Sequence, residues 1–425
     1  MANKSKQWAA IIMMIALFAM IAFVTNLCSP MATIVKNQFG ASEAAGQIGN
    51  YANFIAYLLM GIPSGMLITK MGYKKTALAA LVVGIIGLVI EYLSGQIGGD
   101  GAYWIYLLGA FISGMCMCML NTVVNPLLNV LGGGGKTGNQ LIQIGGAFNS
   151  AAAVAVYILM GALIGEVTKD TMISYATPAM FIALGIFIVA FIVLLFTKIE
   201  EPEQAPMEMS LIPGALKFRH FALGALAIFL YMSVEVGTPT YMISYLQTPE
   251  IGVTAGVAAL IASVYWLMMF IGRSIGGAIG GKVSSRAMVT TVSIAAFVLV
   301  LFGMLAPQNW LVNVPGIDWA NLKVIWAEVP VGIFAFILVG LCTSVMWGAI
   351  FNLATEGLGK YTAIASGAFM TMVFGFAIMV GLQGLVADWT GSYMTSYVVV
   401  LFCAAYILFY ALVGSKNVNK DIPVD

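Results

Sequence analysis

Long apolar stretches separated by short polar segments follow one another along the whole chain of 425 residues. A helix that crosses a lipid bilayer needs about 20 mostly apolar residues, because its backbone must satisfy its hydrogen bonds internally. Twelve stretches meet this requirement, so we predict twelve transmembrane helices. Those of the first half are Trp8–Ala32, Gly46–Thr69, Thr76–Ser94, Ala102–Leu131, Gln140–Gly165 and Pro178–Thr197. Those of the second half are Phe221–Leu246, Thr254–Gly281, Ala287–Leu305, Pro330–Ala354, Thr362–Val386 and Tyr393–Gly414.

The composition is that of a membrane protein, with 61% hydrophobic and 8% charged residues. Soluble domains carry about 25% charged residues. The net charge of +1 gives no indication of nucleic-acid binding. The first apolar stretch is too long for a removable signal peptide and has no small-residue cleavage site. We therefore expect an all-α polytopic membrane protein in the lipid bilayer, acting as a monomer without a nucleic-acid partner.

Lysine and arginine residues are unevenly divided between the segments that join the apolar stretches. If the N-terminus is cytoplasmic, fourteen of them fall in cytoplasmic segments, and only Lys36, Lys169 and Lys323 fall outside. Cytoplasmic loops of membrane proteins carry the excess of Lys and Arg, so we expect both termini in the cytoplasm. The expected location is the cytoplasmic, or inner, membrane.

The longest charged interruption, Lys198–His220, contains four glutamates and three prolines. It predicts a cytoplasmic linker, residues 198–220, between an N-terminal six-helix bundle (residues 1–197) and a C-terminal one (residues 221–425). A second long interruption, Ala306–Glu328, is expected on the outside. Its tryptophans are expected at the level of the lipid headgroups.

A turn rich in glycine and lysine joins the second and third stretches, with the sequence Gly65-Met-Leu-Ile-Thr69-Lys70-Met-Gly72-Tyr-Lys74-Lys75. A degraded copy, Gly277–Arg286, lies at the corresponding place in the second half. Glycine allows a tight turn and close helix contact, and the lysines hold the turn in the cytoplasm. Two six-helix halves with such a repeat are typical of secondary transporters. The turn resembles the loop motif of the major facilitator superfamily, and we expect Lys70 and Lys74 to act at the cytoplasmic gate.

Three further motifs make this resemblance more specific: Asn125-Pro126 in the fourth stretch, Glu235-Val-Gly237 in the seventh and Ile271-Gly272-Arg273 in the eighth. Taken together and in this order, they resemble the fucose–galactose–glucose:proton symporter family of that superfamily over nearly the whole chain. The resemblance implies twelve transmembrane helices in two six-helix bundles, the major facilitator fold, around a cavity at the membrane midplane. It also implies uptake of a neutral monosaccharide, a hexose or 6-deoxyhexose, by secondary active transport with a coupled proton.

Four positions depart from the family pattern. An aspartate of the family's first helix and a glutamate of its fourth are replaced by Ser29 and Asn121. A glutamine and an arginine of its fifth helix are replaced by Gly146 and Leu141. Glu235 is then the one acid expected at the midplane, which makes a proton the expected coupling ion. Sodium coupling and uniport are alternatives, as are a nucleoside, an amino sugar or an acidic sugar as the substrate.

Glu235 is a lone carboxylate within the apolar stretch Phe221–Leu246. A charge at the bilayer centre costs about 2.5–3.5 kcal/mol on insertion scales, and such residues usually line polar pathways. We expect Glu235 to accept a hydrogen bond from a sugar hydroxyl and to carry the coupled proton. A purely structural pair with Arg273 is the alternative. Pro239 removes a backbone hydrogen bond shortly after Glu235, which predicts a kink or break in this helix.

Neutral polar side chains gather in the first, fourth and fifth stretches. Sugar hydroxyls need donors and acceptors together, and amides supply both, although hydrogen bonding between helices would explain any single one. The expected substrate-binding set of the first half is Asn26, Ser29, Asn121, Asn125, Gln143 and Asn149. The second half is expected to add Glu235, Tyr241, Trp347, Asn352 and Gln383, with Tyr265 and Trp266 as further aromatic surface.

Arg273 is expected toward the cytoplasmic end of its helix, at the gate and too far inward to contact substrate. The sequence has no intramembrane cluster of metal ligands and no Ser/His or paired-aspartate arrangement. We therefore expect no metal, no cofactor and no enzymatic activity, with a membrane-embedded enzyme or sensor as the alternative of another class. A drug exporter, a further alternative, would need a larger apolar cavity with fewer amides.

Overall fold

The computed structural model describes residues 4–39, 46–97, 99–133, 135–164, 171–199, 201, 208–279, 282–318, 323–419 and 421–424. The helices of the first half are α1 (Lys4–Phe39), α3 (Ile48–Met71), α4 (Tyr73–Ile97), α5 (Gly99–Leu131), α6 (Gly135–Ile164) and α7 (Thr177–Phe196). Those of the second half are α8 (Ile212–Leu216), α9 (Arg219–Met232), α10 (Thr238–Leu246), α11 (Ala255–Ile279), α12 (Ser285–Leu305), α13 (Gly332–Thr355), α14 (Thr362–Thr371), α15 (Gly375–Thr390) and α16 (Tyr393–Phe409). Two strands, β1 (Leu311–Asp318) and β2 (Lys323–Pro330), lie between α12 and α13.

The described residues contain twelve spans that are long and apolar enough to cross a membrane, which agrees with the twelve predicted helices. The helix bounds differ from the predicted ones mainly at the ends. Helix α1 continues to Phe39, beyond the predicted end at Ala32. The eleventh span consists of α14 and α15 joined by a 3₁₀ turn at Met372–Phe374.

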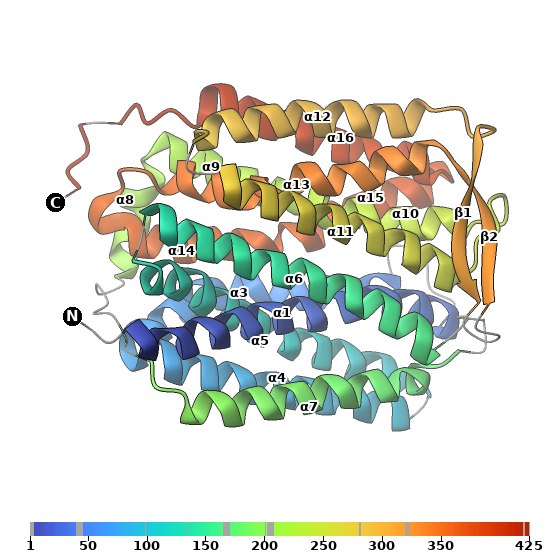
Figure 1. Cartoon of the computed structure of the whole chain (residues 1–425), viewed down its shortest axis with the longest axis horizontal. Helices are drawn as coiled ribbons and strands as arrows, with labels where there is room; N and C mark the ends of the chain where they lie inside the picture. The colour runs from blue at the N-terminus through green and yellow to red at the C-terminus, as the bar shows by residue number, and fades with distance from the viewer. Residues whose placement is uncertain are drawn as a thin grey trace.

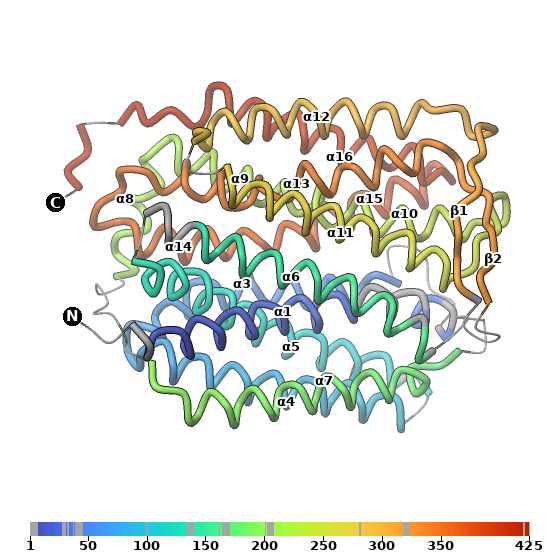
Figure 2. The backbone as a smooth tube through the Cα atoms, viewed as in Figure 1, coloured from blue at the N-terminus to red at the C-terminus, as the bar shows by residue number. Residues whose placement is uncertain are grey.

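The helices form two bundles that lie against each other. Helices α1–α7 fill the lower half of Figure 1, and α9–α16 fill most of the upper half. Both chain termini lie at one end of the molecule, called here the terminus end, and the strands lie at the other, called the hairpin end (Figure 1). The bundles meet where α6 packs against α11 and where α3 packs against α14 and α15. Figure 2 shows α6 and α11 running side by side along this junction.

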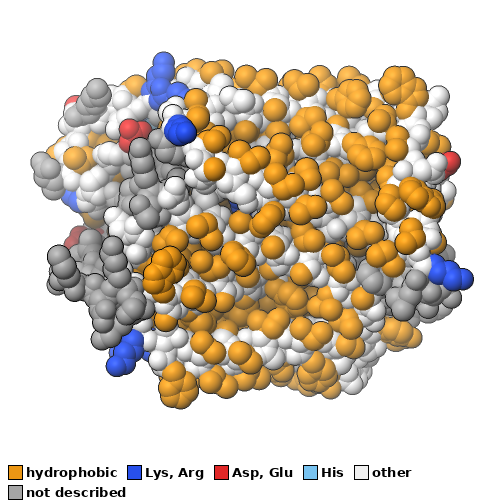
Figure 3. All heavy atoms as spheres, viewed as in Figure 1, with side chains coloured by type: hydrophobic (Ala, Val, Ile, Leu, Met, Phe, Trp, Pro, Cys, Tyr) orange, Lys and Arg blue, Asp and Glu red, His pale blue; other side chains and the backbone are white. Residues whose placement is uncertain are grey.

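The outer surface of the bundles matches a lipid environment. Figure 3 shows apolar side chains spread over the middle of the visible face, with charged side chains near its two ends. Large apolar residues are exposed on helices of both halves, among them Phe196, Leu305 and Trp389. Exposed apolar surface on this scale would be unfavourable in water, and it fits helices that face acyl chains.

The seventh helix contains the distortion that Pro239 predicts, in the form of a π turn rather than a break. Residues Ser233–Gly237 form this turn between α9 and α10. Pro239 lies in the first turn of α10, where a missing N–H is tolerated. The carbonyl of Glu235, four residues before the proline, instead accepts a hydrogen bond of 2.7 Å from the Tyr265 hydroxyl. A side chain of α11 thus bonds the carbonyl that would receive the usual helical hydrogen bond from residue 239 if it were not proline.

The predicted external loop contains an antiparallel hairpin that the sequence analysis missed. Strands β1 and β2 pair along their length, with Pro315 opposite Trp326. The hairpin packs on α11 at Gly316, where a Cβ would lie 2.7 Å from Val257. Trp310 and Trp326 are exposed, whereas Trp319 lies outside the described residues.

Two glycines of the first bundle differ sharply in their surroundings. Gly114 of α5 lies against α3 so closely that a Cβ there would overlap the backbone carbonyl of Asn53. Gly185 of α7 is exposed, and a Cβ there would meet nothing within 4 Å. Close approach of helix backbones through small residues is a usual way to pack helices in a membrane.

We predict opposite effects of alanine at these two glycines. Gly114→Ala should lower the midpoint of thermal unfolding, because overpacking typically costs about 1–3 kcal/mol. Gly185→Ala should leave it unchanged or raise it, because alanine is about 0.5–1 kcal/mol better than glycine within a helix. Thermal unfolding of the detergent-purified variants measures both effects, and equal midpoints would contradict the close α3–α5 contact.

Candidate functional site

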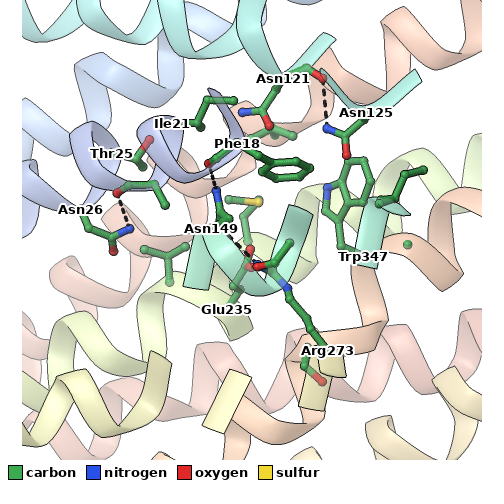
Figure 4. A pocket seen from close by; sticks show the side chains of 18 of the residues that line it. Phe18, Ile21, Thr25, Asn26, Asn121, Asn125, Asn149, Glu235, Arg273 and Trp347 are labelled. Carbon is green, nitrogen blue, oxygen red and sulfur yellow. Dashed lines mark hydrogen bonds and ion pairs between the residues drawn. The ribbon is translucent and has the colours of Figure 1, made fainter. Parts of the chain in front are cut away.

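A cavity of about 150 Å³ lies between the two bundles. Residues of α1, α3, α5 and α6 line it from the first bundle. Residues of α9, the π turn, α11, α13, α14 and the 3₁₀ turn Met372–Phe374 line it from the second. Figure 4 shows how these side chains converge. The cavity is lined by seven residues of the predicted substrate-binding set: Asn26, Asn121, Asn125, Gln143, Asn149, Glu235 and Trp347. Their contact with a substrate stays a prediction.

Glu235 and Arg273 form a buried ion pair in the cavity wall. Glu235 Oε1 lies 3.5 Å from Arg273 Nη2, and the two side chains are only 12% and 13% exposed. Arg273 was expected too far inward to reach this site, and that expectation is wrong, because its side chain lines the cavity. Its charge is nevertheless already paired with Glu235. An anionic ligand would have to compete with this carboxylate.

The same guanidinium also connects the two bundles. Arg273 Nη1 donates to the carbonyl oxygen of Gly146 at 2.6 Å and to Ser150 Oγ at 2.9 Å, both on α6. Asn149 Oδ1 lies 3.3 Å from the same nitrogen. These are charge-assisted hydrogen bonds, which are stronger than neutral ones. They hold α11 against α6 on the side of the cavity nearer the terminus end.

Gly146 makes this contact possible. A Cβ at this position would lie 3.2 Å from Arg273 Cδ, which is tighter than an ordinary van der Waals contact, and 3.4 Å from Nε. A longer side chain here would occupy the space that the arginine needs. The resemblance to the symporter family led us to expect a glutamine at position 146, and Arg273 occupies the space that such a side chain would need.

The asparagines of the cavity wall also bond within the protein. Asn149 Nδ2 donates to the Phe18 carbonyl at 2.8 Å, joining α6 to α1. Asn121 Nδ2 donates to the Tyr57 hydroxyl at 2.9 Å, joining α5 to α3. Within the described residues, Asn26 Nδ2 donates to the carbonyl of its own helix at Ala22. From the sequence alone, hydrogen bonding between helices was an alternative to lining the cavity. Asn121 and Asn149 do both.

Three residues of the predicted set are not among those that line this cavity. Tyr241 is fully buried and donates to the Val380 carbonyl at 3.1 Å, between α10 and α15. Gln383 is fully buried against Gly237 of the π turn. Asn352 is exposed near the terminus end of α13. A fourth predicted residue, Ser29, has a side chain outside the described part of the chain.

The lysines that were expected at the gate lie within the first bundle. Lys70 is exposed, and Lys74 Nζ donates to the carbonyls of Leu195 and Thr197 at 2.9 and 2.7 Å. The Glu201 carboxylate accepts from the backbone N–H groups of Tyr73 and Lys74 and so caps the start of α4. The gating role of these lysines stays a prediction.

The bundles also touch on the side of the cavity nearer the hairpin end. The rings of Phe54 on α3 and Phe376 on α15 lie 4.1 Å apart between centroids. Beyond them, burial lowers the pKa of Lys36 at the end of α1, and the nearby Asp388 carboxylate on α15 opposes this shift. The cavity therefore has contacts between the bundles on both sides.

Several polar residues in and near the site were missed from the sequence. Thr25 and Tyr57 line the cavity, and neither differs in the sequence from an ordinary helix residue. Glu91 of α4 is a second buried carboxyl group; it accepts from Ser113 Oγ at 2.7 Å and is not among the residues that line the cavity. A carboxylate in an apolar stretch was the signal that could have identified it.

The comparison with known families decides the classification. Residues 13–382 match the family model of the Major Facilitator Superfamily. The chain belongs to this superfamily. Its twelve spans in two bundles are the major facilitator fold that the sequence motifs predicted.

Relatives and solved structures within the superfamily agree with this assignment. The chain is 26% identical over 410 residues to the glucose/galactose transporter of Brucella abortus, covering 94% of this chain and 93% of the relative. It is 23% identical over 431 residues to the L-fucose-proton symporter of Escherichia coli, covering 95% and 93%. The crystal structure of the E. coli fucose:proton symporter matches with a TM-score of 0.71 at 21% identity, covering 96% of this chain and 98% of that one.

The buried ion pair gives a prediction that does not depend on the substrate. Arg273→Gln leaves the Glu235 carboxylate buried without its partner, a change that typically costs about 3–5 kcal/mol of folding free energy. Glu235→Gln should cost less, because Gly146 and Ser150 still accept from the guanidinium. The double variant should be more stable than the sum of the two losses implies, by roughly 0.5–3 kcal/mol. Thermal unfolding of the four proteins measures this coupling, and additive losses would contradict the ion pair.

Proposed function

We propose that this protein is a secondary active transporter that takes up a neutral monosaccharide, a hexose or 6-deoxyhexose, across the cytoplasmic membrane together with a proton. The observation that carries the proposal is the cavity between the bundles, where neutral amides surround a single compensated ion pair. Because Glu235 and Arg273 neutralise each other, the wall favours an uncharged ligand. The names of the relatives, which are transporters of glucose, galactose and fucose, support the same substrate class.

Proton coupling is assigned to Glu235. It is the one carboxylate among the described residues that line the cavity. A proton on Glu235 would cancel its attraction to Arg273, whose hydrogen bonds cross to α6. Protonation can therefore change the contact between the bundles, and rocking of the bundles around the cavity gives alternating access. The proton coupling named for the fucose symporter supports this choice of ion.

Further features belong to the same proposal. Exposed basic residues such as Lys70, Lys75 and Arg219 lie near the terminus end, which supports a cytoplasmic location of both termini in the inner membrane. We take the bundles to be residues 1–197 and 221–425, with the linker at 198–220. The protein acts as a monomer, needs no cofactor and catalyses no reaction. Sodium coupling, uniport and a different substrate are outcomes that the experiments below distinguish.

The first test concerns the substrate. Proteoliposomes that contain the purified protein should take up labelled D-galactose or D-glucose, and other neutral hexoses should compete with this uptake. Sialic acid should not compete, because an acidic sugar would have to displace Glu235 from Arg273. Strong uptake of an acidic sugar or a nucleoside, with no response to any neutral hexose, would overturn the proposed substrate class.

The second test concerns the coupling ion. Glu235→Gln keeps the volume and hydrogen-bonding capacity of the side chain and cannot bind the proton. We expect it to abolish sugar accumulation driven by an imposed proton gradient and to spare exchange of sugar without a gradient. Glu91→Gln is the matched control, because this carboxyl group is buried as well and does not line the cavity.

Three results would redirect the coupling proposal. Accumulation by Glu235→Gln on a proton gradient would exclude this carboxylate from the coupling step. Accumulation by the wild-type protein on a sodium gradient alone would replace the proton by sodium. Equilibration without accumulation under either gradient would make the protein a uniporter.

A further inference from the structure

Three polar atoms of residues that line the cavity have no hydrogen-bond partner in the described part of the chain. They are Thr25 Oγ1 on α1, Asn125 Oδ1 on α5 and Trp266 Nε1 on α11, and each of the three atoms is buried. Most buried polar groups in folded proteins have a partner, so each exception needs an explanation. The three atoms belong to residues that surround one cavity, which gives them a common explanation.

The hydrogen bonds of comparable side chains in this protein show why these unpaired atoms are unusual. Other threonine hydroxyls in these helices donate to a carbonyl of the preceding turn; Thr122 donates to Cys118 and Thr238 to Val234, both at 2.8 Å. Thr25 makes no such bond. Asn125 uses its Nδ2 group to donate to the Asn121 carbonyl at 3.0 Å, which leaves its Oδ1 as the free acceptor. Figure 4 shows the side chain of Asn125 pointing from α5 toward Trp347 on the opposite bundle.

The missing partners define the chemistry of a ligand. The indole N–H of Trp266 needs an acceptor, the amide oxygen of Asn125 needs a donor, and a threonine hydroxyl serves as either. A carboxylate offers only acceptors and an ammonium group only donors. Hydroxyl groups offer both, so one polyhydroxylated molecule can satisfy all three atoms at once.

We propose that Thr25, Asn125 and Trp266 are direct contacts for hydroxyl groups of the transported sugar and determine which hydroxyls it must carry. This inference rests on the proposed function. Thr25 and Asn125 belong to the first bundle and Trp266 to the second, so a sugar bound to all three joins the bundles. Without sugar, closure around the cavity leaves these atoms unpaired. The sugar therefore stabilises the closed arrangement by supplying the partners that the protein lacks.

Two conservative variants test this assignment. Trp266→Phe removes the N–H group and keeps an aromatic ring, and Thr25→Val removes the hydroxyl and keeps the shape. Binding of D-galactose, D-glucose and their monodeoxy derivatives is measured by calorimetry on detergent-purified protein. Each variant should weaken binding of the parent sugar about tenfold, as expected for one lost hydrogen bond. For the monodeoxy derivative that lacks the hydroxyl facing the altered residue, wild type and variant should bind equally.

A stability readout separates a sugar contact from a structural role. In the absence of sugar, Thr25→Val should unfold at the wild-type temperature or above it, because it loses a buried hydroxyl that had no partner. Trp266→Phe also loses side-chain volume, so its readout is the change that sugar produces. The rise in unfolding temperature that sugar produces should be smaller than for the wild type. Trp389→Phe and Thr122→Val are the matched controls, since neither residue lines the cavity, and both should bind sugar as the wild type does.

The outcomes are distinct. If wild-type protein binds a hexose and both variants bind every sugar equally well, the inference is overturned and the proposed function stands. A lower unfolding temperature without sugar, with the same loss for every derivative, would assign these residues to packing and also overturn it. If no neutral hexose binds to the wild-type protein, the proposed function fails, and the inference fails with it.

Discussion

The buried guanidinium of Arg273 imposes a condition that several other features of the molecule meet. A cation removed from water must be paired and hydrogen bonded, or it destabilises the fold. The π turn supplies the Glu235 carboxylate, and α6 supplies a carbonyl and a hydroxyl at Gly146 and Ser150. The absence of a side chain at Gly146 gives the arginine room to reach them. One charge thereby determines both the electrostatics of the cavity and a contact between the bundles.

The lipid bilayer is the reason that the helices could be predicted from the sequence. Every spanning helix has to be long and apolar, so twelve helices were visible in the hydrophobic pattern. Beyond the bilayer this constraint ends, and the continuation of α1 to Phe39 was not visible. The hairpin was missed because Pro315 and Gly316 interrupt the alternation by which a strand is recognised.

The sequence showed which residues of the site are polar and lie within apolar helices. It did not show which of these side chains point into the cavity. Asn121 and Gln383 are both amides within the predicted apolar stretches, yet Asn121 lines the cavity and Gln383 is buried against Gly237. The difference depends on which neighbour each helix face meets, and the sequence of one helix does not contain that information. Thr25 gave no signal, because an isolated helical threonine normally bonds to its own backbone. Arg273 was expected near the cytoplasmic end because of its position along the helix. That expectation did not allow for the length of its side chain, which extends to the cavity.

The hairpin at the far end bears on how the second bundle can deform. Its strands join α12 to α13, and Val331 N–H donates to the Trp310 carbonyl at 2.8 Å to close its base. Its first strand also packs on α11 through Gly316. Three successive helices thus share one stiff connection, whereas an irregular loop would let each slide along its neighbours. This connection stiffens the second bundle against the first, so a hairpin beyond the ends of the helices helps decide where the molecule can bend.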